Sequence, residues 1–541
     1  MRCLRAENSC VYLLFLMLLV LPLVGCERPD PAVTIVATTI PFSLPPTSPV
    51  TRPADSAVAV GEVPVPPTSP VQDPAVAISA FQGDYVGTPT PDPPRPGSPG
   101  SGGGSSDNYQ VHVVGVGETL GYLAQYYDVS LSELIEINGL AESDFLYLGQ
   151  ELRVPAGGSS AGLVGPSNKI IPNSELVYGP AAKAFDVAAF VNGYDSYLAS
   201  YQLEVEGRLL SGPEVVQLVA DRYSVNPRLL LAALEYRTGW VTEAAPFDNG
   251  YPMGRAVPGL EGLYWQLGWA ADQLNWGFYG RAEGGVNSVL VGGVTQVAFA
   301  ADINDGTAGV QYWLAADPAG SYDSWLVDIS PAGFYATYTQ LFGNPFAYTV
   351  DPLWPANLSQ PNWQLPWAAG ETWYFTGGPH GGWASGSGWA ALDFVPDDDG
   401  QLGCYPSEAW VTSMTGGVVS RSDFGAVVVD VDGDGFAGTG WAVTYMHLET
   451  RDRIPAGTVV QPGDRLGHPS CEGGFSNGTH VHISRTYNGR WVAADGSIPF
   501  MLGGWLSQGL GQEYDGLLVK GDMVKEACEC REEINAIPAG E

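Results

Sequence analysis

The sequence predicts a multidomain protein with a small α/β module of strand, helix, helix, strand order, a mostly α-helical middle domain and an all-β antiparallel C-terminal domain. Two observations predict this organisation. The 541 residues exceed one compact core, since domains usually hold about 100 to 200 residues. Stretches rich in Pro, Gly and Ser divide the chain, and after about Leu365 glycine, tryptophan and β-branched residues dominate.

The charge of the chain limits its partners. It has 58 acidic and 23 basic residues, which gives a formal net charge of -35. A nucleic-acid partner is excluded on this ground, because a phosphate backbone is bound by clustered Lys and Arg. Solubility alone accounts for the acidity, which names no substrate.

Residues 1–26 predict a lipoprotein signal peptide. Arg2 and Arg5 precede an apolar run of about 14 residues, which is short for a membrane span. The Leu-Val-Gly-Cys tetrad that ends at Cys26 resembles the bacterial lipobox. This resemblance implies lipidation of Cys26 and anchoring to the outer face of a membrane. An ordinary signal or an uncleaved anchor is the alternative, and in each case the mature chain is exported.

Residues 27–107 predict a disordered linker. They are rich in Pro, Gly, Ser, Thr and Val and have no periodic apolar pattern for a packed core. An extended Pro-rich chain rises about 3 Å per residue, so this tether spans on the order of 100 to 200 Å. We therefore expect the folded part to reach targets within the cell envelope.

Residues 108–156 predict the small α/β module. An alternating run near Val111 indicates a strand, Thr119 can cap a first helix, and Ser130 precedes a second one. The closing "GQELRVP" reads as a strand. The stretch resembles the LysM module, which binds N-acetylglucosamine-containing glycans. The resemblance implies a groove lined by Gly117, Glu118, Thr119, Leu120, Asn138, Gly139 and Leu140. The alternative is that these residues only shape turns and caps.

Residues 175–345 predict the helical domain. Asn226-Pro227 starts a buried helix that resembles the first active-site helix of lytic transglycosylases. In that alignment Arg237 stands at the position of the catalytic acid, and Glu235 lies about 200° around the helix from it. We expect a lysozyme-like but non-catalytic domain for wall binding or spacing. The alternative is a muramidase that uses Glu235.

The sequence of residues 360–510 predicts the all-β domain. Five polar residues in this domain are candidates for a metal site. In a strand, residues two apart share a face, so His480 and His482 can project into one cleft. His447 ends another alternating strand. His380 and Asp393 flank a loop of small residues that can fold back. Because zinc accepts His nitrogen and Asp oxygen, and a catalytic site keeps a fourth position open, these residues are metal candidates.

These residues resemble the lysostaphin-type zinc endopeptidases, especially their β-lytic, staphylolysin-like branch, from about Leu365 to Val492. That branch has a Leu-Pro-Trp segment before a long glycine-rich His-to-Asp loop, and the likeness continues through "YMHL", "CEGGFSNGTHVHI" and "YNGRWV". Lysostaphin itself has a short His-x-x-x-Asp motif, from which this chain departs. The motifs are highly specific.

The resemblance implies the role of each residue. His380, Asp393 and His482 would bind one Zn²⁺ per chain, while His447 and His480 would share the roles of general base and oxyanion stabiliser. The implied function is an envelope-anchored zinc endopeptidase that cleaves peptidoglycan peptides and is targeted to glycan by the LysM module. The alternatives are a non-enzymatic peptidoglycan-binding lipoprotein, or a muramidase or lytic transglycosylase acting through the helical domain.

A second metal is a separate possibility. Asp430, Asp432 and Asp434 in "DVDGDG" copy the start of a calcium loop, although Trp441 stands where an EF-hand has its twelfth-position carboxylate. An acidic hairpin turn is the alternative.

The remaining cysteines predict disulfides. An exported chain with Cys404, Cys471, Cys528 and Cys530 allows three pairings. We expect Cys404 with Cys471, as a substitute for a pairing made elsewhere in the β-lytic relatives, and Cys528 with Cys530. Residues 511–541 are expected to form a C-terminal extension.

Overall fold

The structure is a computed structural model that describes residues 109–114, 120–127, 129–140, 146, 150–155, 163–247, 250–283 and 285–540. The predicted signal peptide with Cys26 and the predicted linker lie outside the described residues, as do Gly117, Glu118 and Thr119. Within the described part of the chain, no helix combines the length and apolar character needed to cross a membrane.

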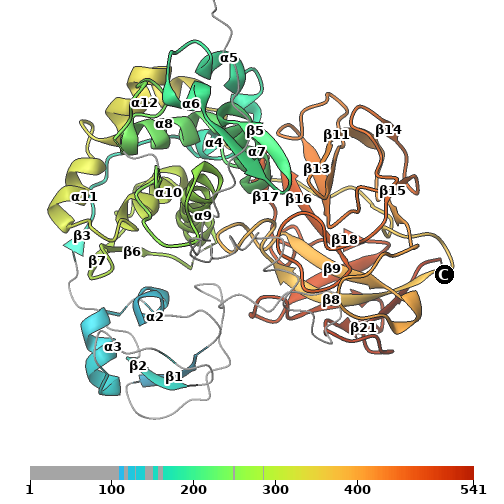
Figure 1. The fold of residues 1–541 in the computed structure, drawn as a ribbon. Coiled ribbons are helices and arrows are strands. Elements are labelled where there is room, and N and C mark those ends of the chain that lie inside the picture. The colour runs from blue at the N-terminus through green and yellow to red at the C-terminus, as the bar shows by residue number, and fades with distance from the viewer. Residues whose placement is uncertain are drawn as a thin grey trace, which may run out of the picture. The chain divides into compact units, whose positions relative to one another are not determined.

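The N-terminal module has the predicted strand, helix, helix, strand order. Strand β1 (Tyr109–Val113) pairs antiparallel with β2 (Glu151–Pro155), and helices α2 (Leu120–Tyr126) and α3 (Leu131–Asn138) lie between them in sequence (Figure 1). Side chains from both helices and β2 form its small core: Leu120, Leu123, Ala124, Leu134, Leu152 and Val154.

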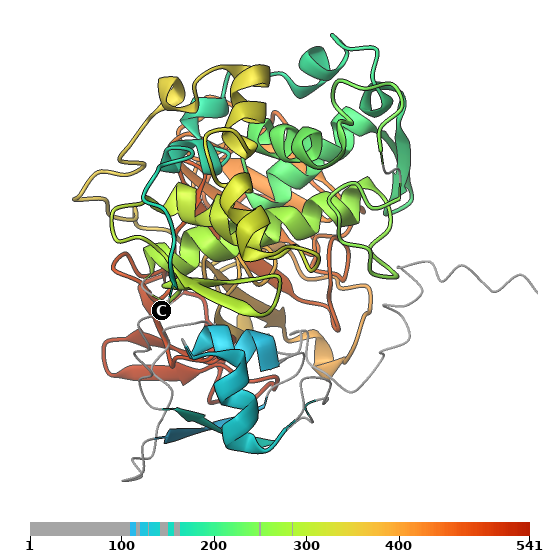
Figure 2. The same ribbon diagram turned by 90° about the vertical axis from the view of Figure 1, so that its left-hand side faces the viewer.

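The middle domain is built mainly from helices. They are α4 (Asn173–Leu176), η1 (Pro180–Ala182), α5 (Val187–Val191), α6 (Tyr197–Ser200), α7 (Gly212–Tyr223), α8 (Pro227–Thr238), α9 (Leu263–Ala282), α10 (Asp305–Ala315), α11 (Tyr322–Asp328), α12 (Phe334–Phe342) and η2 (Pro345–Tyr348). Helix α9 packs against α7 and α10, and α8 packs against α12. Figure 2 shows this group of helices in green and yellow.

Short strands complete the middle domain. β4 (Gln202–Val205) and β5 (Arg208–Ser211) form a hairpin before α7. β6 (Ser288–Val291) and β7 (Thr295–Ala298) form a second hairpin, and β3 (Leu163–Val164) joins β7 in parallel.

The start of α8 follows from its sequence. Asn226 accepts a hydrogen bond from the Arg228 amide at 3.0 Å, and Pro227 occupies the first turn, where no amide donor is needed. The helix ends at Gly239, whose φ of 75° is the left-handed conformation that glycine adopts without cost. The helix start predicted at Asn226-Pro227 is therefore confirmed.

A buried ion pair ties α8 to α4. Arg228 donates to both carboxylate oxygens of Glu175, at 2.6 and 2.9 Å, and its guanidinium lies 4.2 Å from the centre of the Tyr348 ring. Burial raises the pKa of the Glu175 carboxyl, while the charge and hydrogen bonds of Arg228 pull it back. Since Glu175 is fully buried, loss of Arg228 would leave an uncompensated charge in the core.

The C-terminal domain is antiparallel, as predicted. Its main sheet runs in the spatial order β14 (Val459–Val460), β11 (Gly417–Asp423), β12 (Ala426–Asp430), β13 (Trp441–Met446), β16 (Val481–Tyr487), β9 (Ala391–Pro396), β8 (Thr372–His380) and β22 (Ala536–Pro538), with β17 (Arg490–Trp491) paired to β16. Strands that alternate β-branched or aromatic residues bury one face in a core that contains Phe375, Phe394, Val427, Val443 and Ile483.

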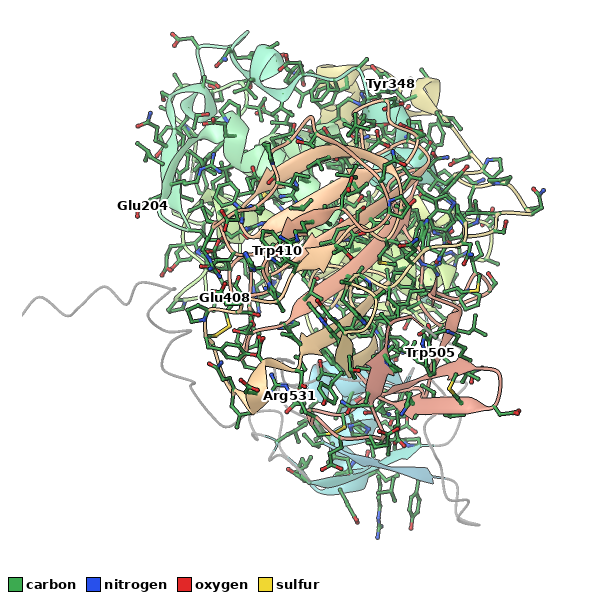
Figure 3. All side chains as sticks on the ribbon, turned by 90° about the vertical axis from the view of Figure 1, so that its right-hand side faces the viewer. Glu204, Tyr348, Glu408, Trp410, Trp505 and Arg531 are labelled. Carbon is green, nitrogen blue, oxygen red and sulfur yellow. A yellow bond between two sulfur atoms is a disulfide. The ribbon has the colours of Figure 1, made fainter. Side chains whose placement is uncertain are left out.

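Further strands lie at the end of the chain and in the loops. A second antiparallel sheet contains β18 (Met501–Leu502), β19 (Trp505–Gly509), β20 (Gly516–Lys520) and β21 (Met523–Glu526), with Trp505 fully buried (Figure 3). β10 (Val411–Thr412) pairs with β15 (Arg465–Gly467), and η3 (Asp398–Gly400) follows β9.

Residues 511–540 are part of this fold. They supply β20, β21 and β22, and β22 pairs with β8 at the edge of the main sheet. The structure thus differs from the predicted boundary at residue 510, because β20 and β21 continue the sheet of β18 and β19, and β22 finds its partner β8 far away in sequence.

The middle domain contacts the C-terminal domain next to its long loop. The side chain of Asp272 on α9 accepts from the Gly386 amide at 2.8 Å, and the Tyr279 hydroxyl accepts from the Trp491 amide at 2.9 Å. The guanidinium of Arg222 lies 4.7 Å from the centre of the Trp383 ring. The loop between His380 and Asp393 is therefore held by helices of another domain.

Candidate metal centre

Three neighbouring strands carry the three predicted metal ligands. His380 is the last residue of β8, Asp393 lies in β9, and His482 lies in β16, whose register places it directly opposite Asp393. β8 and β9 pair with two register irregularities near Gly377 and His380. Side chains that are 102 residues apart in sequence therefore meet at one place on the sheet.

Gly377 provides the room for the aspartate. It pairs with Asp393 across β8 and β9, and a Cβ atom at this position would lie 2.7 Å from Asp393 Oδ2. A contact that short does not occur between a real Cβ and an oxygen. The glycine in "FTGGPH" is therefore needed so that the Asp393 carboxylate can lie against the strand.

The ligand atoms converge in a buried cluster. His380 Nε2 lies 2.9 Å from His482 Nδ1, and Asp393 Oδ1 lies 3.3 Å from each of these nitrogens. His380 is 2% exposed, Asp393 is 0% exposed and His482 is 7% exposed. One atom from each residue can thus reach a single ion.

In both His380 and His482, one ring nitrogen is hydrogen-bonded to a backbone carbonyl, which leaves the other nitrogen available to bind a metal ion. His380 Nδ1 lies 2.8 Å from the Gly378 carbonyl, and His482 Nε2 lies 3.1 Å from the Gly382 carbonyl. A carbonyl only accepts, so these nitrogens carry the protons and donate. The lone pairs of His380 Nε2 and His482 Nδ1 therefore face each other.

This arrangement fits a cation. Two nitrogen lone pairs and a carboxylate that meet out of water repel one another unless a positive charge lies between them. Two His nitrogens and one carboxylate oxygen are a common donor set for catalytic zinc.

The other two histidines, His447 and His480, lie beside this cluster. The centres of their rings are 4.4 Å apart, and His480 Nε2 is 3.8 Å from Asp393 Oδ1. His480 Nδ1 lies 2.8 Å from the Gly478 carbonyl and His447 Nδ1 lies 3.0 Å from the Glu472 carbonyl. Each ring therefore donates through Nδ1 and keeps a lone pair on Nε2.

Both rings are held neutral. Burial lowers the pKa of His447 well below its ordinary value, and the neighbouring His480 and His482 lower it further. Burial is also the main cause of the lowered pKa of His480. Neutral imidazoles with a free Nε2 can accept a proton from water.

The backbone at His447 is unusual. This residue directly follows β13 and has a φ of 61°, a conformation that non-glycine residues rarely adopt. Ser470 donates twice to the His447 carbonyl, from its amide at 2.6 Å and from its hydroxyl at 3.0 Å. These bonds stabilise the conformation in which the imidazole leaves the strand.

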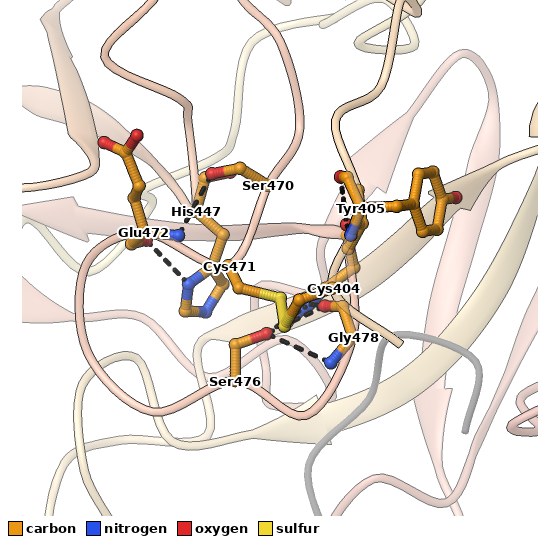
Figure 4. The surroundings of a disulfide bond; sticks show 10 residues. Cys404, Tyr405, His447, Ser470, Cys471, Glu472, Ser476 and Gly478 are labelled. Carbon is orange, nitrogen blue, oxygen red and sulfur yellow. Dashed lines mark hydrogen bonds between the residues drawn. A yellow bond between two sulfur atoms is a disulfide. The ribbon is translucent and has the colours of Figure 1, made fainter. Parts of the chain in front are cut away.

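The disulfide between Cys404 and Cys471 closes the loop that orients both rings (Figure 4). Cys471 lies between Ser470, which binds the His447 backbone, and Glu472, whose carbonyl accepts from His447 Nδ1. The predicted pairings of Cys404 with Cys471 and of Cys528 with Cys530 both form in the structure.

Two residues of this site were missed by the sequence analysis. The ring of Tyr514 stacks on His380 with centres 4.2 Å apart, and the Glu513 carboxylate accepts from the Gly381 amide at 3.0 Å. Both residues lie between β19 and β20, in the segment that was predicted to be a C-terminal extension. No local pattern marks them, because their role depends on the return of the chain to β8.

The other predicted site residues lie elsewhere. Asn138 donates through its side-chain amide to the Leu134 and Arg153 carbonyls, and its Oδ1 accepts from the Arg153 amide, so this residue ties α3 to β2. Gly139 ends α3 with a φ of 63°. Leu120 lies in the core of the module and Leu140 packs against that core. Asp430, Asp432 and Asp434 form a second acidic group.

The middle domain uses its two candidate residues structurally. Both oxygens of Glu235 accept hydrogen bonds from residues 241 and 242, at 2.5 to 3.1 Å. Arg237 forms an ion pair with Asp317 at 2.9 Å. These contacts hold the segment that follows α8.

An antiparallel domain with a buried His, Asp, His cluster and two further neutral histidines is the kind of centre that a metallopeptidase uses. Comparison with known proteins agrees. Residues 169–356 match the family described as LasA, N-terminal domain, and residues 112–155 match the LysM domain family. The chain is 27% identical over 370 residues to Protease LasA of Pseudomonas aeruginosa, covering 64% of this chain and 81% of that protein.

Other relatives match the C-terminal part. The chain is 28% identical over 160 residues to Beta-lytic metalloendopeptidase of Achromobacter lyticus, covering 28% of this chain and 39% of that protein. A solved structure described as a novel M23 metalloprotease, pseudoalterin, from the deep sea is 27% identical, with a TM-score of 0.26, covering 31% of this chain and 96% of that one. The chain is LasA-like: it is similar to lysostaphin-type metallopeptidases and carries a LysM domain.

The resemblance predicted from the motifs is therefore confirmed. The helical domain predicted for residues 175–345 lies inside the match to the LasA N-terminal family. Its likeness to lysozymes stays a prediction.

Proposed function

We propose that this protein is an envelope-anchored zinc endopeptidase that hydrolyses stem or cross-link peptides of peptidoglycan. The observation that carries the proposal is the meeting of His380 Nε2, Asp393 Oδ1 and His482 Nδ1 within 3.3 Å of one another in a buried cluster. The backbone carbonyls of Gly378 and Gly382 leave both nitrogens free to ligate one ion.

Zinc held by these three residues would lower the pKa of a coordinated water towards about 7 and polarise the scissile carbonyl. The chain supplies the rest of the chemistry. His480 Nε2 lies 3.8 Å from Asp393 Oδ1, so it can accept the proton of the attacking water beside the ligands. The accepted proton can then pass to the leaving amine.

His447 completes the pair. Its ring centre lies 4.4 Å from that of His480, and Nδ1 is fixed by the Glu472 carbonyl. A protonated His447 or His480 donates through Nε2, which stabilises the negative charge that develops on the carbonyl oxygen. The two rings share the roles of general base and oxyanion stabiliser.

The N-terminal part would bring the enzyme to its substrate. We propose that the LysM module binds N-acetylglucosamine-containing glycan, that Cys26 carries the membrane lipid and that residues 27–107 act as the tether. Calcium binding by Asp430, Asp432 and Asp434 stays a prediction.

A muramidase in the middle domain is less well supported. A glycosidase needs a carboxylic acid that is free to protonate the glycosidic oxygen. Glu235 instead accepts from two backbone amides and from the Thr242 hydroxyl. Its carboxylate is thus occupied in holding the turn after α8.

The proposal is tested by zinc content and product analysis of the full chain. We expect about one zinc per wild-type chain and release of new amino groups from purified sacculi. His380→Ala should lose both, because one ligand is removed. His468→Gln is the matched control, since His468 is equally buried but its Nδ1 binds the Ala409 carbonyl outside the cluster.

Two outcomes would contradict this function. One is a His380→Ala variant that keeps zinc and wall-lysing activity. The other is a digest in which mass spectrometry finds new reducing or anhydro sugar ends without new amino groups, because this product belongs to a muramidase or a lytic transglycosylase.

A further inference from the structure

A second group of metal-ligating side chains lies at the turn between β12 and β13. Asp430 is the last residue of β12, and Asp432 and Asp434 follow in the turn. One oxygen from each carboxylate lies within 4.8 Å of the others. Asp430 is 0% exposed, whereas Asp432 and Asp434 are exposed.

One oxygen of the buried aspartate is unsatisfied. Asp430 Oδ2 accepts from the Gly435 amide at 2.8 Å, but Asp430 Oδ1 finds no hydrogen-bond donor among the described residues. A buried carboxylate oxygen without a donor is costly unless a cation or a proton lies beside it. The unsatisfied Oδ1 belongs to the same group as Asp432 and Asp434, so it points to a ligand at this turn.

A cation from the middle domain already lies at the edge of this group. The ammonium of Lys183, just after η1, lies 2.5 Å from Asp434 Oδ2. Tyr178 packs edge-to-face on Phe436 of the same turn, with ring centres 5.3 Å apart. The turn is therefore a point of contact between the two domains as well as an acidic group.

One ammonium does not balance three carboxylates. Lys183 contacts Asp434, so one positive charge lies beside a group of three carboxylates. If all three carboxylates are ionised, the group keeps an excess negative charge that a doubly charged ion would neutralise.

We propose that the Asp430, Asp432 and Asp434 group is a binding site for a hard divalent cation of the calcium class, and that this cation competes with Lys183 for Asp434. Bound cation would thus weaken one contact between the helical domain and the C-terminal domain. Three carboxylate oxygens suit calcium, with water or backbone carbonyls as further ligands. The inference does not rest on the zinc chemistry.

The absent twelfth-position carboxylate sets the expected strength. Trp441 stands where an EF-hand loop has its bidentate ligand, so this site lacks one anionic ligand. We expect an affinity typical of extracellular calcium modules, with a Kd on the order of 10⁻⁴ to 10⁻³ M.

The test is a calcium titration of the zinc-loaded full chain by calorimetry. Asp432→Asn removes an exposed ligand without opening the core, and we expect it to weaken calcium binding about tenfold or more. Lys183→Met removes the competitor and should strengthen binding about two- to fivefold, a modest change because Lys183 is 45% exposed.

Lys169→Met is the matched control for Lys183→Met. Lys169 is also an exposed lysine of the middle domain segment, and its removal changes the net charge by the same amount. The proposed competition between Lys183 and the cation is supported if Lys169→Met binds calcium as tightly as the wild type and Lys183→Met binds it more tightly.

Three results would overturn the inference. The first is that neither the wild type nor Lys183→Met shows a heat of calcium binding at millimolar calcium. The second is that Asp432→Asn binds calcium with unchanged affinity. The third is that Lys183→Met and Lys169→Met bind calcium with equal affinity. Because zinc is loaded beforehand and zinc content is measured separately, none of these results depends on peptidase activity.

Discussion

Each of the four site histidines points one ring nitrogen at a backbone carbonyl, and this determines what the other nitrogen can do. The carbonyls of Gly378 and Gly382 leave His380 Nε2 and His482 Nδ1 free to act as ligands. Those of Gly478 and Glu472 leave Nε2 of His480 and of His447 as proton acceptors. We therefore expect these four identical side chains to divide into ligands and acid–base groups because of the backbone around them.

This division predicts different outcomes for the two pairs. In His447→Ala and His480→Ala the three ligand atoms remain, so we expect about one zinc per chain. Hydrolysis should fall by roughly 10² to 10⁴, the usual contribution of a general acid or base. Zinc content and hydrolysis of a peptidoglycan peptide, measured side by side, check both parts.

The His380→Ala variant provides the comparison, since it should lose zinc as well. If His480→Ala loses zinc to the same extent as His380→Ala, then His480 is a ligand and its assignment as an acid–base group is wrong.

At the level of elements, the sequence was informative where local patterns decide the structure. The strands predicted to end at His447 and to carry His480 and His482 form close to the expected positions, and Asn226-Pro227 starts its helix. The spacing of His480 and His482 and the small residues between His380 and Asp393 indicated one cluster. These features depend on neighbours that are close along the chain.

Other elements could not be predicted because their causes are long-range. β22 joins the sheet through pairing with β8, more than 150 residues earlier, and Tyr514 reaches His380 by the same return of the chain. The left-handed backbone of His447 depends on two bonds from Ser470. No periodicity of the sequence encodes such contacts.

The loop from Ser470 to His480 is the element on which catalysis should depend most. Its carbonyls fix His447 and His480, and the Cys404–Cys471 disulfide ties it to the strand-connecting segment at Tyr405, whose amide donates to Thr479. In Cys404→Ser/Cys471→Ser we expect a lower kcat with zinc retained. The stability of the domain should fall by about 2 to 4 kcal/mol.

The other disulfide offers a matched control. Cys528→Ser/Cys530→Ser also removes one disulfide, but residues 528 and 530 contact Asn535 near β22 and not the histidines. Equal loss of kcat in both double variants, measured on folded protein, would argue against a special role for the loop.

At the level of the whole molecule, we expect the LysM module to bind the wall first and the peptidase domain to cleave it afterwards. If the LysM module binds glycan, it raises the local concentration of the enzyme on the wall without touching the scissile peptide. Deletion of residues 109–155 should therefore reduce binding to sacculi and hydrolysis of whole wall. Hydrolysis of a soluble peptide fragment should be unchanged. A parallel loss on the soluble peptide would contradict this division of roles.

Zinc should also couple the domains, because the loop that joins two of its ligands is held by the helical domain. Gly382 lies in this loop and its carbonyl orients His482, while Gly386, four residues later, donates to Asp272 on α9. An ion that binds only the folded state stabilises it by about 2.7 kcal/mol at 100 times its Kd. Removal of zinc by a chelator should therefore lower the melting temperature and increase amide hydrogen exchange from residue 381 to residue 390. Asp272→Ala should increase exchange in the same segment with zinc still bound, since it loses only the outer support. If chelation leaves both the melting temperature and the exchange of this segment unchanged, the ion does not bind where His380, Asp393 and His482 meet.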